Sequence, residues 1–148
     1  MIDFMKEAIK EANKALFKDE VPIGAVIVKD NKIIARGYNR RQTSKNALDH
    51  AEMIAIEKAC KKLASWHLVD CDIYVTLEPC PMCSGAIANA RIRHLYYACR
   101  ETTSNDNLCE QILSSTRLNH KVEITYDATY SELCQEMLSK YFKEKRKR

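Results

Sequence analysis

The sequence predicts an α/β protein, built as a three-layer αβα sandwich around a mixed five-stranded sheet. Segments with apolar residues at helical spacing alternate with short segments rich in Val, Ile and Tyr. The first two short segments are separated by Lys29-Asp30-Asn31, a turn sequence that predicts an antiparallel hairpin. The 148 residues contain no repeat, linker or low-complexity run, so we expect one domain over residues 1–148.

The first half of the chain predicts two helices and the hairpin. Apolar side chains recur at helical spacing over residues 2–18, and Val21-Pro22 stops this helix. IGAVIV at 23–28 is typical of a buried strand, and KIIARGYN at 32–39 predicts its antiparallel partner. Helical periodicity resumes from about residue 46 and continues to residue 63. These elements supply one edge of the expected sheet and two of its covering helices.

The second half predicts three more strands and two more helices. The expected strands are DIYVTL at 72–77, HLYYAC at 94–99 and KVEIT at 121–125. A short helix rich in small residues is expected at 82–90, and a final helix at 131–145. Helices that alternate with strands in this way predict parallel pairing in this part of the sheet.

Positive charge is concentrated at the C-terminal end. The last nine residues, KYFKEKRKR, hold six Lys or Arg and one Glu, a net charge of +5. The whole chain has a net charge of +4, so the other 139 residues together carry 4 − 5 = −1. Residues 31–48 add five cations and no acid. Both stretches suit contact with a polyanion, although Lys and Arg also suit the negative end of a helix dipole in water.

The composition indicates a cytoplasmic protein with reduced thiols and no membrane association. No apolar run approaches the roughly 18 residues of a membrane span, and the charged first twenty residues lack the plan of a signal peptide. Seven cysteines are an odd number, which argues against a closed disulfide framework. Five of them lie in patterned helices and strands, where we expect inert packing: Cys60, Cys71, Cys99, Cys109 and Cys134.

The other two cysteines, in LEPCPMC at 77–83, form a Cys-x-x-Cys pair at a predicted helix start. A redox pair, half of a structural zinc site and part of a catalytic zinc site all fit this spacing. Zinc is favoured because His50-Ala51-Glu52 opens another helix and offers a third ligand. The remaining histidines, His67, His94 and His120, lie at strand edges or loops and are expected at the surface.

Three protein ligands, His50, Cys80 and Cys83, leave the fourth position of a tetrahedral zinc ion to water. Such an open position is typical of catalytic rather than structural sites. Glu52 is then well placed as the proton shuttle for this water, although a first-turn glutamate also suits the helix dipole. His-x-Glu followed by Pro-Cys-x-x-Cys is the signature of zinc nucleobase deaminases.

The whole chain resembles the bacterial tRNA-specific adenosine deaminases, of the cytidine/deoxycytidylate deaminase superfamily. The resembling segments occur in the same order over nearly the full length: EVPIGAVIV (20–28), GYNR (37–40), HAEMIAI (50–56), IYVTLEPCPMCSGAI (73–87), ARIRH (90–94), LNHKVEI (118–124) and LSKYFKEKR (138–146). The central segments are shared with deaminases of small bases. LNHKVEI and the basic tail are more particular to the tRNA enzymes.

The resemblance implies a cytidine-deaminase-like fold, one Zn²⁺ per subunit, a homodimer and a tRNA anticodon stem-loop as substrate. It implies hydrolytic conversion of the wobble adenosine to inosine, with Glu52 as general acid/base. Substrate binding is expected of Asn39, Ala51 and Pro79. Possible RNA contacts are Arg40, Arg41, Lys45, Tyr141, Phe142, Lys143 and Arg146. The competing interpretations are a turn residue for Asn39 and core packing for the two aromatic residues.

Two segments depart from the family pattern. Residues 100–107, RETTSNDN, contain no glycine where the tRNA enzymes usually carry a glycine-rich loop. Residues 46–49, NALD, stand where an Asp-Pro-Thr-Ala type sequence is common, although Asn46 or Asp49 still suits a helix cap. Two other hypotheses therefore stay open: a deaminase of a free base or nucleoside such as guanine or cytosine, and a zinc-stabilised RNA-binding module without catalysis.

Overall fold

The computed structural model describes residues 1–100 and 107–147 and confirms the predicted α/β fold class. Residues 101–106 of the polar segment 100–107 lie outside the described residues. Along the chain the elements are α1 (Phe4–Phe17), β1 (Gly24–Lys29), β2 (Lys32–Tyr38), α2 (Arg41–Ser44), α3 (Ala51–Leu63), β3 (Cys71–Val75), α4 (Pro81–Asn89), β4 (His94–Tyr97), α5 (Leu108–Leu113), β5 (Glu123–Tyr126), the 3-10 turn η1 (Ala128–Tyr130) and α6 (Ser131–Arg146).

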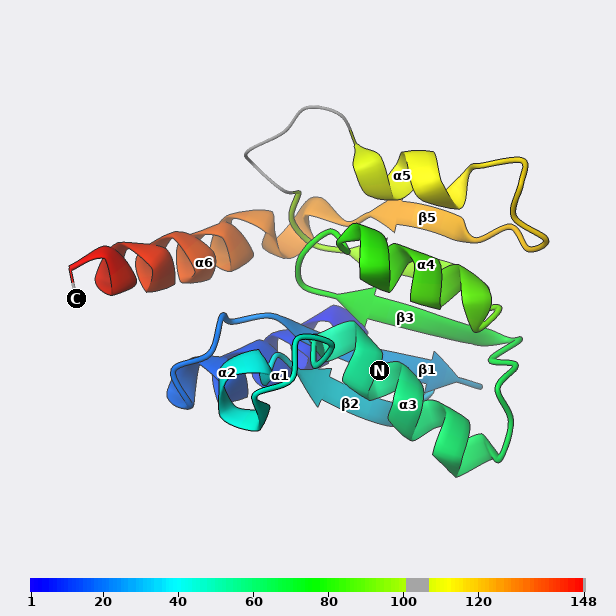
Figure 1. Cartoon of the computed structure of the whole chain (residues 1–148), viewed down its shortest axis with the longest axis horizontal. Coiled ribbons are helices and arrows are strands. Elements are labelled where there is room, and N and C mark those ends of the chain that lie inside the picture. The colour runs from blue at the N-terminus through cyan, green and yellow to red at the C-terminus, as the bar shows by residue number, and fades with distance from the viewer. Residues whose placement is uncertain (101–106, 148) are drawn as a thin grey trace.

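The strands form one mixed sheet in the order β2-β1-β3-β4-β5 (Figure 1). β1 pairs antiparallel with β2 and with β3, whereas β3, β4 and β5 are parallel neighbours. The registers Gly24↔Tyr38, Ala25↔Val75 and Val75↔Tyr97 place the start of β1 at the same end of the sheet as the C-terminal ends of β2, β3 and β4. The segments that follow β2, β3 and β4 meet at this end of the sheet, and α/β sheets commonly bind ligands beyond the C-terminal ends of their strands.

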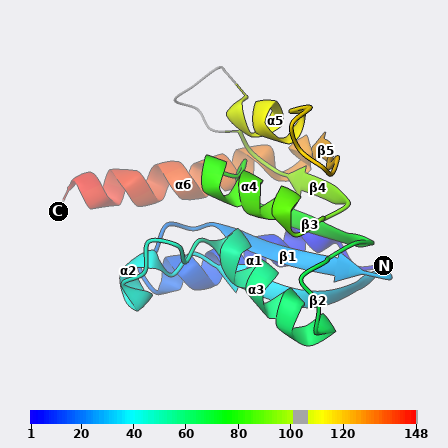
Figure 2. The same ribbon diagram turned by 45° about the vertical axis from the view of Figure 1, so that its right-hand side comes forward.

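Helices cover both faces of the sheet, which makes three layers (Figures 1 and 2). Buried side chains of α3, α4 and α5 pack with Ile27, Ile73 and Leu95 on one face. On the other face, α1 and the first part of α6 pack with Val26 and Val28. The rest of α6 extends past the sheet (Figures 1 and 2). Among the described residues, no helix combines the length and the apolar character that crossing a membrane requires.

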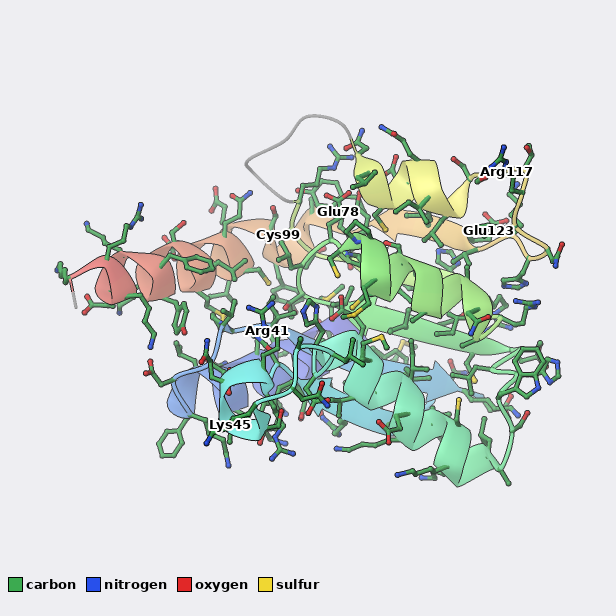
Figure 3. All side chains as sticks on the ribbon, viewed as in Figure 1. Arg41, Lys45, Glu78, Cys99, Arg117 and Glu123 are labelled. Atoms are coloured by element: carbon green, nitrogen blue, oxygen red, sulfur yellow. The ribbon has the colours of Figure 1, made fainter. Side chains whose placement is uncertain are left out.

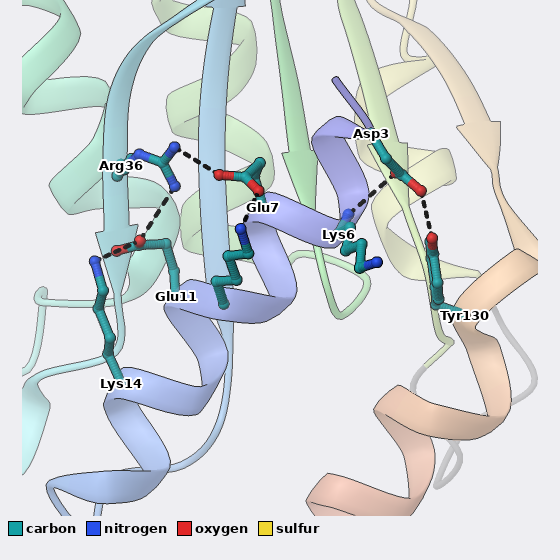
Figure 4. Close-up of polar contacts among 8 residues, drawn as sticks. Asp3, Lys6, Glu7, Glu11, Lys14, Arg36 and Tyr130 are labelled. Carbon is teal, nitrogen blue, oxygen red and sulfur yellow. Dashed lines mark hydrogen bonds and ion pairs between the residues drawn. The ribbon is translucent and has the colours of Figure 1, made fainter. Parts of the chain in front are cut away.

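Helix α1 is held by polar contacts at its start and along one side (Figure 4). Asp3 caps the helix through its side chain and also accepts a hydrogen bond from the Tyr130 hydroxyl, which follows β5. On the side toward β2, Arg36 binds Glu7 at 2.8 Å and Glu11 at 3.4 Å. These contacts fix α1 against the hairpin. The C-terminal end of α1 then lies close to the end of the sheet at which β1 starts.

Two glycines allow helices to approach the hairpin closely. A Cβ added to Gly24 would lie 2.1 Å from the carbonyl oxygen of Ala8 in α1. A Cβ added to Gly37 would lie 2.4 Å from the carbonyl oxygen of Ala51, the first residue of α3. Any larger residue would push a helix away from its strand. Gly37 therefore fixes how near the start of α3 comes to β2.

The structure differs from the sequence prediction at the helix expected from about residue 46. That helix begins at Ala51 with His50 as its N-cap residue, and neither Asn46 nor Asp49 caps it. The Asn46 side chain accepts a hydrogen bond from the Leu48 amide instead, a local turn that competes with helix formation. Two short helices, α2 and α5, were not predicted, because neither shows an apolar periodicity long enough to detect.

Candidate active site

Two helix starts bring the predicted metal ligands together. His50 is the N-cap residue of α3, Cys80 is the N-cap residue of α4, and Cys83 lies in the first turn of α4. Pro81 occupies the first position of α4, where its fixed φ favours helix initiation and its missing N–H costs nothing. β2 precedes α3 and β3 precedes α4, and both strands terminate at the same end of the sheet. The side chains of the three predicted ligands therefore converge there.

The ligand atoms of this cluster lie within 4.8 Å of one another. His50 Nδ1 is 3.6 Å from the sulfur of Cys80 and 3.6 Å from the sulfur of Cys83. The side chains of His94 and His120 are hydrogen bonded elsewhere, His94 to the Thr125 hydroxyl and His120 to the carbonyl oxygen of Ile92. Within the described part of the chain, only these three ligand-type residues gather in this way.

Hydrogen bonds within the cluster stabilise a single thiolate. The pKa of Cys80 is lowered to about 4, chiefly because Cys83 donates a hydrogen bond to its sulfur, and His50 donates another. The pKa of Cys83 is raised, because its thiol donates to Cys80 and because it is buried. The hydrogen bond to Cys80 also raises the pKa of His50. The three side chains are therefore electrostatically coupled, with the thiolate form favoured at Cys80 and the thiol form at Cys83.

The donor set fits a zinc ion. One imidazole and two thiols are nitrogen and sulfur ligands that zinc prefers, and they come from rigid helix starts. A tetrahedral ion held by three protein groups keeps one position for another molecule. All seven cysteines of the chain are free, so no disulfide competes for Cys80 or Cys83.

Glu52 lies in the first turn of α3, two residues after His50. Its side chain is buried, with 4% of its surface exposed. Burial strips water from the carboxylate and raises the pKa of Glu52 to about 7. A carboxyl group that titrates near neutral pH accepts and donates protons with similar ease, which is what general acid/base catalysis requires.

A cavity of about 480 Å³ opens onto the cluster. It has the volume typical of small-molecule sites. Six of the predicted catalytic, metal-binding and substrate-binding residues line it: Asn39, His50, Ala51, Glu52, Pro79 and Cys80. Cys83 lies behind this lining and is fully buried. The structure thus brings together residues from the end of β2, the start of α3 and the segment after β3.

The predicted RNA contacts lie on two sides of the cavity. Arg41 and Lys45 lie at opposite ends of α2 (Figure 3), and the Arg41 guanidinium comes within 3.4 Å of His50 Nε2. On the side of α6, Phe142 lines the cavity and is 46% exposed. Arg146 lines a neighbouring groove of about 750 Å³ that also contains Phe142.

The remaining RNA candidates differ in exposure. Arg40, Lys45 and Lys143 are exposed at the surface. Tyr141 is only 8% exposed and its hydroxyl donates to the carbonyl oxygen of Asp19, so its ring packs α6 against the turn after α1. Core packing, the alternative interpretation of Tyr141, thus describes its environment. A contact of these side chains with RNA stays a prediction.

Sequence reasoning missed several residues that line the cavity. Leu77 and Glu78 belong to the LEPC segment, and their position beside the ligand cysteines was the available signal (Figure 3 labels Glu78). Leu108 and Cys109 begin α5, after the polar segment, and no local pattern marks them. Cys109 was expected to pack inertly, and it is indeed buried, with 2% exposure, although it contributes to the cavity wall.

This combination of fold and site is that of a deaminase, and the comparison with known families agrees. The family model described as MafB19-like deaminase matches residues 2–146. The chain therefore belongs to the MafB19-like deaminase family, and it is an enzyme.

Curated relatives define a narrower group. A tRNA-specific adenosine deaminase of Streptococcus pyogenes serotype M18 is 45% identical over 146 residues, which cover 98% of this chain and 91% of that protein. The tRNA-specific adenosine deaminase of Bacillus subtilis strain 168 is 44% identical over 146 residues, which cover 98% of this chain and 90% of that protein. These relatives confirm the resemblance to bacterial tRNA-specific adenosine deaminases.

Solved structures agree with the fold. A structure from a study of A-to-I editing by tRNA:A34 deaminases at the wobble position of transfer RNA is 40% identical, with a TM-score of 0.77. The match covers 84% of this chain and 96% of that one. A guanine deaminase from Bacillus subtilis is 36% identical, with a TM-score of 0.65, over 92% of this chain and 90% of that one.

Proposed function

We propose that this protein is a zinc-dependent hydrolase that converts adenosine to inosine at the wobble position of a tRNA anticodon. The observation that carries this proposal is the buried Glu52 beside His50, Cys80 and Cys83 at an open cavity. A structural metal site has no need of a buried carboxylate next to an open position. The substrate is supported by the relatives named tRNA-specific adenosine deaminase.

His50, Cys80 and Cys83 would hold one zinc ion per subunit. When bound, the ion supplies a Lewis acid that lowers the pKa of a water molecule to near neutrality. Helix starts favour this arrangement, because the positive end of the helix dipole stabilises thiolate ligands. The buried position of Cys83 behind the cavity lining keeps one side of the site closed to solvent.

Glu52 moves the protons. Its carboxylate accepts one proton from the attacking water and donates it to the adenine ring nitrogen. It then accepts the second proton, from the hydroxyl now on the attacked carbon, and donates it to the departing amine. Water thus replaces the exocyclic amine, ammonia leaves and inosine remains. Asn39, Ala51 and Pro79 line the same cavity and would bind the base around its reacting carbon.

A base inside a stacked helix cannot reach such a cavity, so the adenosine would enter from a single-stranded loop. The cations of α2 and α6 lie on two sides of the entrance and suit the phosphates of that loop. We further propose that residues 1–148 act as one domain, that the enzyme is a homodimer and that it works in the cytoplasm. Light scattering of the purified protein tests the homodimer directly.

The test is an activity assay with metal analysis of the same sample. The zinc-loaded protein is incubated with an anticodon stem-loop that carries adenosine at the wobble position, and nucleosides are measured by mass spectrometry after nuclease digestion. We expect inosine at that position. A stem-loop with guanosine there, free guanine and free cytosine are the comparison substrates. Turnover of free guanine or cytosine without inosine would reject the tRNA substrate in favour of a small base.

The matched variant is Glu52→Ala. It should abolish inosine formation while the content of zinc stays at that of the wild type, because Glu52 is not a ligand in the proposed site. Unchanged activity would rule out the proton-shuttle role. Loss of zinc together with activity would show that Glu52 supports the metal instead.

A further inference from the structure

Glu20 is a buried carboxylate outside the site described above. It lies in the turn between α1 and β1 and is only 1% exposed. Both of its oxygens are used: Oε1 accepts from the Gln42 amide at 3.1 Å, and Oε2 accepts from the Thr43 amide at 2.5 Å and the Thr43 hydroxyl at 2.6 Å. All three donors belong to α2.

Helix α2 depends on this carboxylate for its position. It has only four residues, none of which is buried, and its N-cap residue Arg40 makes no side-chain capping bond. A single helical turn is not stable alone, and its first amides need acceptors. Glu20 supplies those acceptors and places a negative charge at the positive end of the turn. Hydrogen bonding to Glu20, and not apolar packing, therefore holds α2 in place.

Helix α2 in turn sets one wall of the cavity. The Asn39 side-chain oxygen accepts from the Arg41 amide at 3.2 Å, which links the end of β2 to the first residue of the helix. The Arg41 guanidinium lies 3.4 Å from His50 Nε2, and both Asn39 and Arg41 line the cavity. A displacement of α2 would move both side chains relative to the ligand cluster.

The residue before Glu20 holds the opposite wall. The Asp19 carbonyl oxygen accepts from the Tyr141 hydroxyl at 3.2 Å, and its carboxylate binds Lys145 at 2.7 Å. Both partners lie in α6, on either side of Phe142, which lines the cavity. Two adjacent residues of one turn are thus bound to the two elements that flank the entrance.

We propose that the Asp19-Glu20 turn is a brace that sets the geometry of the substrate entrance, with Glu20 as a positioning residue for Asn39 and Arg41. Glu20 acts through α2 and does not touch the reacting atoms. The inference rests on the proposed function for the identity of the substrate that enters. The brace itself rests on the contacts of residues 19 and 20.

The test compares Glu20→Gln with Glu11→Gln in the full-length zinc-loaded protein. Glu11 is a matched control because it is 2% exposed, belongs to α1 and binds Arg36 and Lys14 away from the cavity. In Glu20→Gln, one carboxylate oxygen is replaced by an NH2 group, which cannot accept the hydrogen bond from the N–H donor that faces it. We expect the KM for the stem-loop to rise about tenfold, with kcat changed less than about threefold and zinc content unchanged.

A second measurement separates positioning from general destabilisation. Amide hydrogen exchange of residues 39–45 should be about tenfold faster in Glu20→Gln and unchanged in Glu11→Gln. Thr43→Val removes one of the three hydrogen bonds with little change in shape, so it should show a smaller rise in KM. In the double variant Glu20→Gln/Thr43→Val, the effect on KM should be smaller than the two single effects combined. Equal KM and exchange in the two glutamine variants, or a fall in kcat alone, would overturn the brace.

Failure of the proposed function has a different signature. If the wild-type protein forms no inosine in the stem-loop, the proposed substrate is wrong, and hydrogen exchange alone then decides the brace. Accelerated exchange confined to residues 39–45 of Glu20→Gln would support it. Unchanged exchange there would reject it.

Discussion

Glu52→Gln should change how the stability of the zinc-free protein depends on pH. Burial raises the pKa of Glu52 from 4.5 to about 7. This rise in pKa corresponds to about 3.5 kcal/mol, at about 1.4 kcal/mol for each pH unit. The folded state binds the proton more tightly than the unfolded state. The stabilisation is therefore complete below pH 4.5 and is lost as the pH rises through about 7.

Glutamine keeps the shape of the side chain and cannot ionise, so the variant should not suffer this loss. The unfolding free energy of Glu52→Gln minus that of the wild type should grow between pH 5 and pH 8 by roughly 2.5 kcal/mol, because part of the stabilisation is already lost at pH 5. His50 and Cys80 titrate in both proteins, and their contributions cancel in this difference apart from their charge interactions with Glu52. The comparison thus reports the buried carboxylate together with these interactions.

The assay is urea unfolding of chelator-treated, reduced protein, followed by circular dichroism at several pH values. Glu57→Gln is the control, because it makes the same chemical change in the same helix at a glutamate whose side chain is 67% exposed. A difference between Glu52→Gln and the wild type that stays constant from pH 5 to pH 8 would refute the reasoning. It would mean that burial does not hold the proton on Glu52.

Three further predictions concern the metal site, the packing of α3 and the entrance. Cys83→Ala should lower bound zinc, measured by atomic absorption after dialysis, from about one per chain toward zero, because a neutral methyl cannot replace a thiolate ligand. Gly37→Ala should lower the free energy of unfolding, measured in urea, by about 2 kcal/mol or more, because the new Cβ would lie 2.4 Å from the Ala51 carbonyl oxygen. The control is Gly85→Ala, whose Cβ meets no atom within 4 Å, and it should be neutral or stabilising. Phe142→Ala should raise the KM for the stem-loop severalfold with little change in kcat, and a fall in kcat alone would argue against its place at the entrance.

Part of the site followed from local patterns. His50-Ala51-Glu52 lies early in the helix expected from about residue 46, and Pro79-Cys80 lies just before the helix expected at 82–90. The sequence therefore placed both motifs near helix starts, although the first helix begins later than expected. Alternation of helical and strand patterns also predicted the mixed sheet that joins them. These features depend on residues within a few positions of one another, which is the range over which sequence patterns are informative.

Other parts required contacts between distant residues. Glu20 is separated from Thr43 by 23 positions, and nothing near residue 20 marks its carboxylate as the partner of a four-residue helix. Tyr141 reaches Asp19 across 122 positions, which buries a ring that sequence alone left open to RNA contact or packing. The sequence by itself determined the class of fold and predicted the candidate metal ligands and the candidate proton-transfer glutamate. The shape of the entrance was decided only by the tertiary structure, because short helices without apolar faces are positioned by hydrogen bonds from elsewhere in the chain.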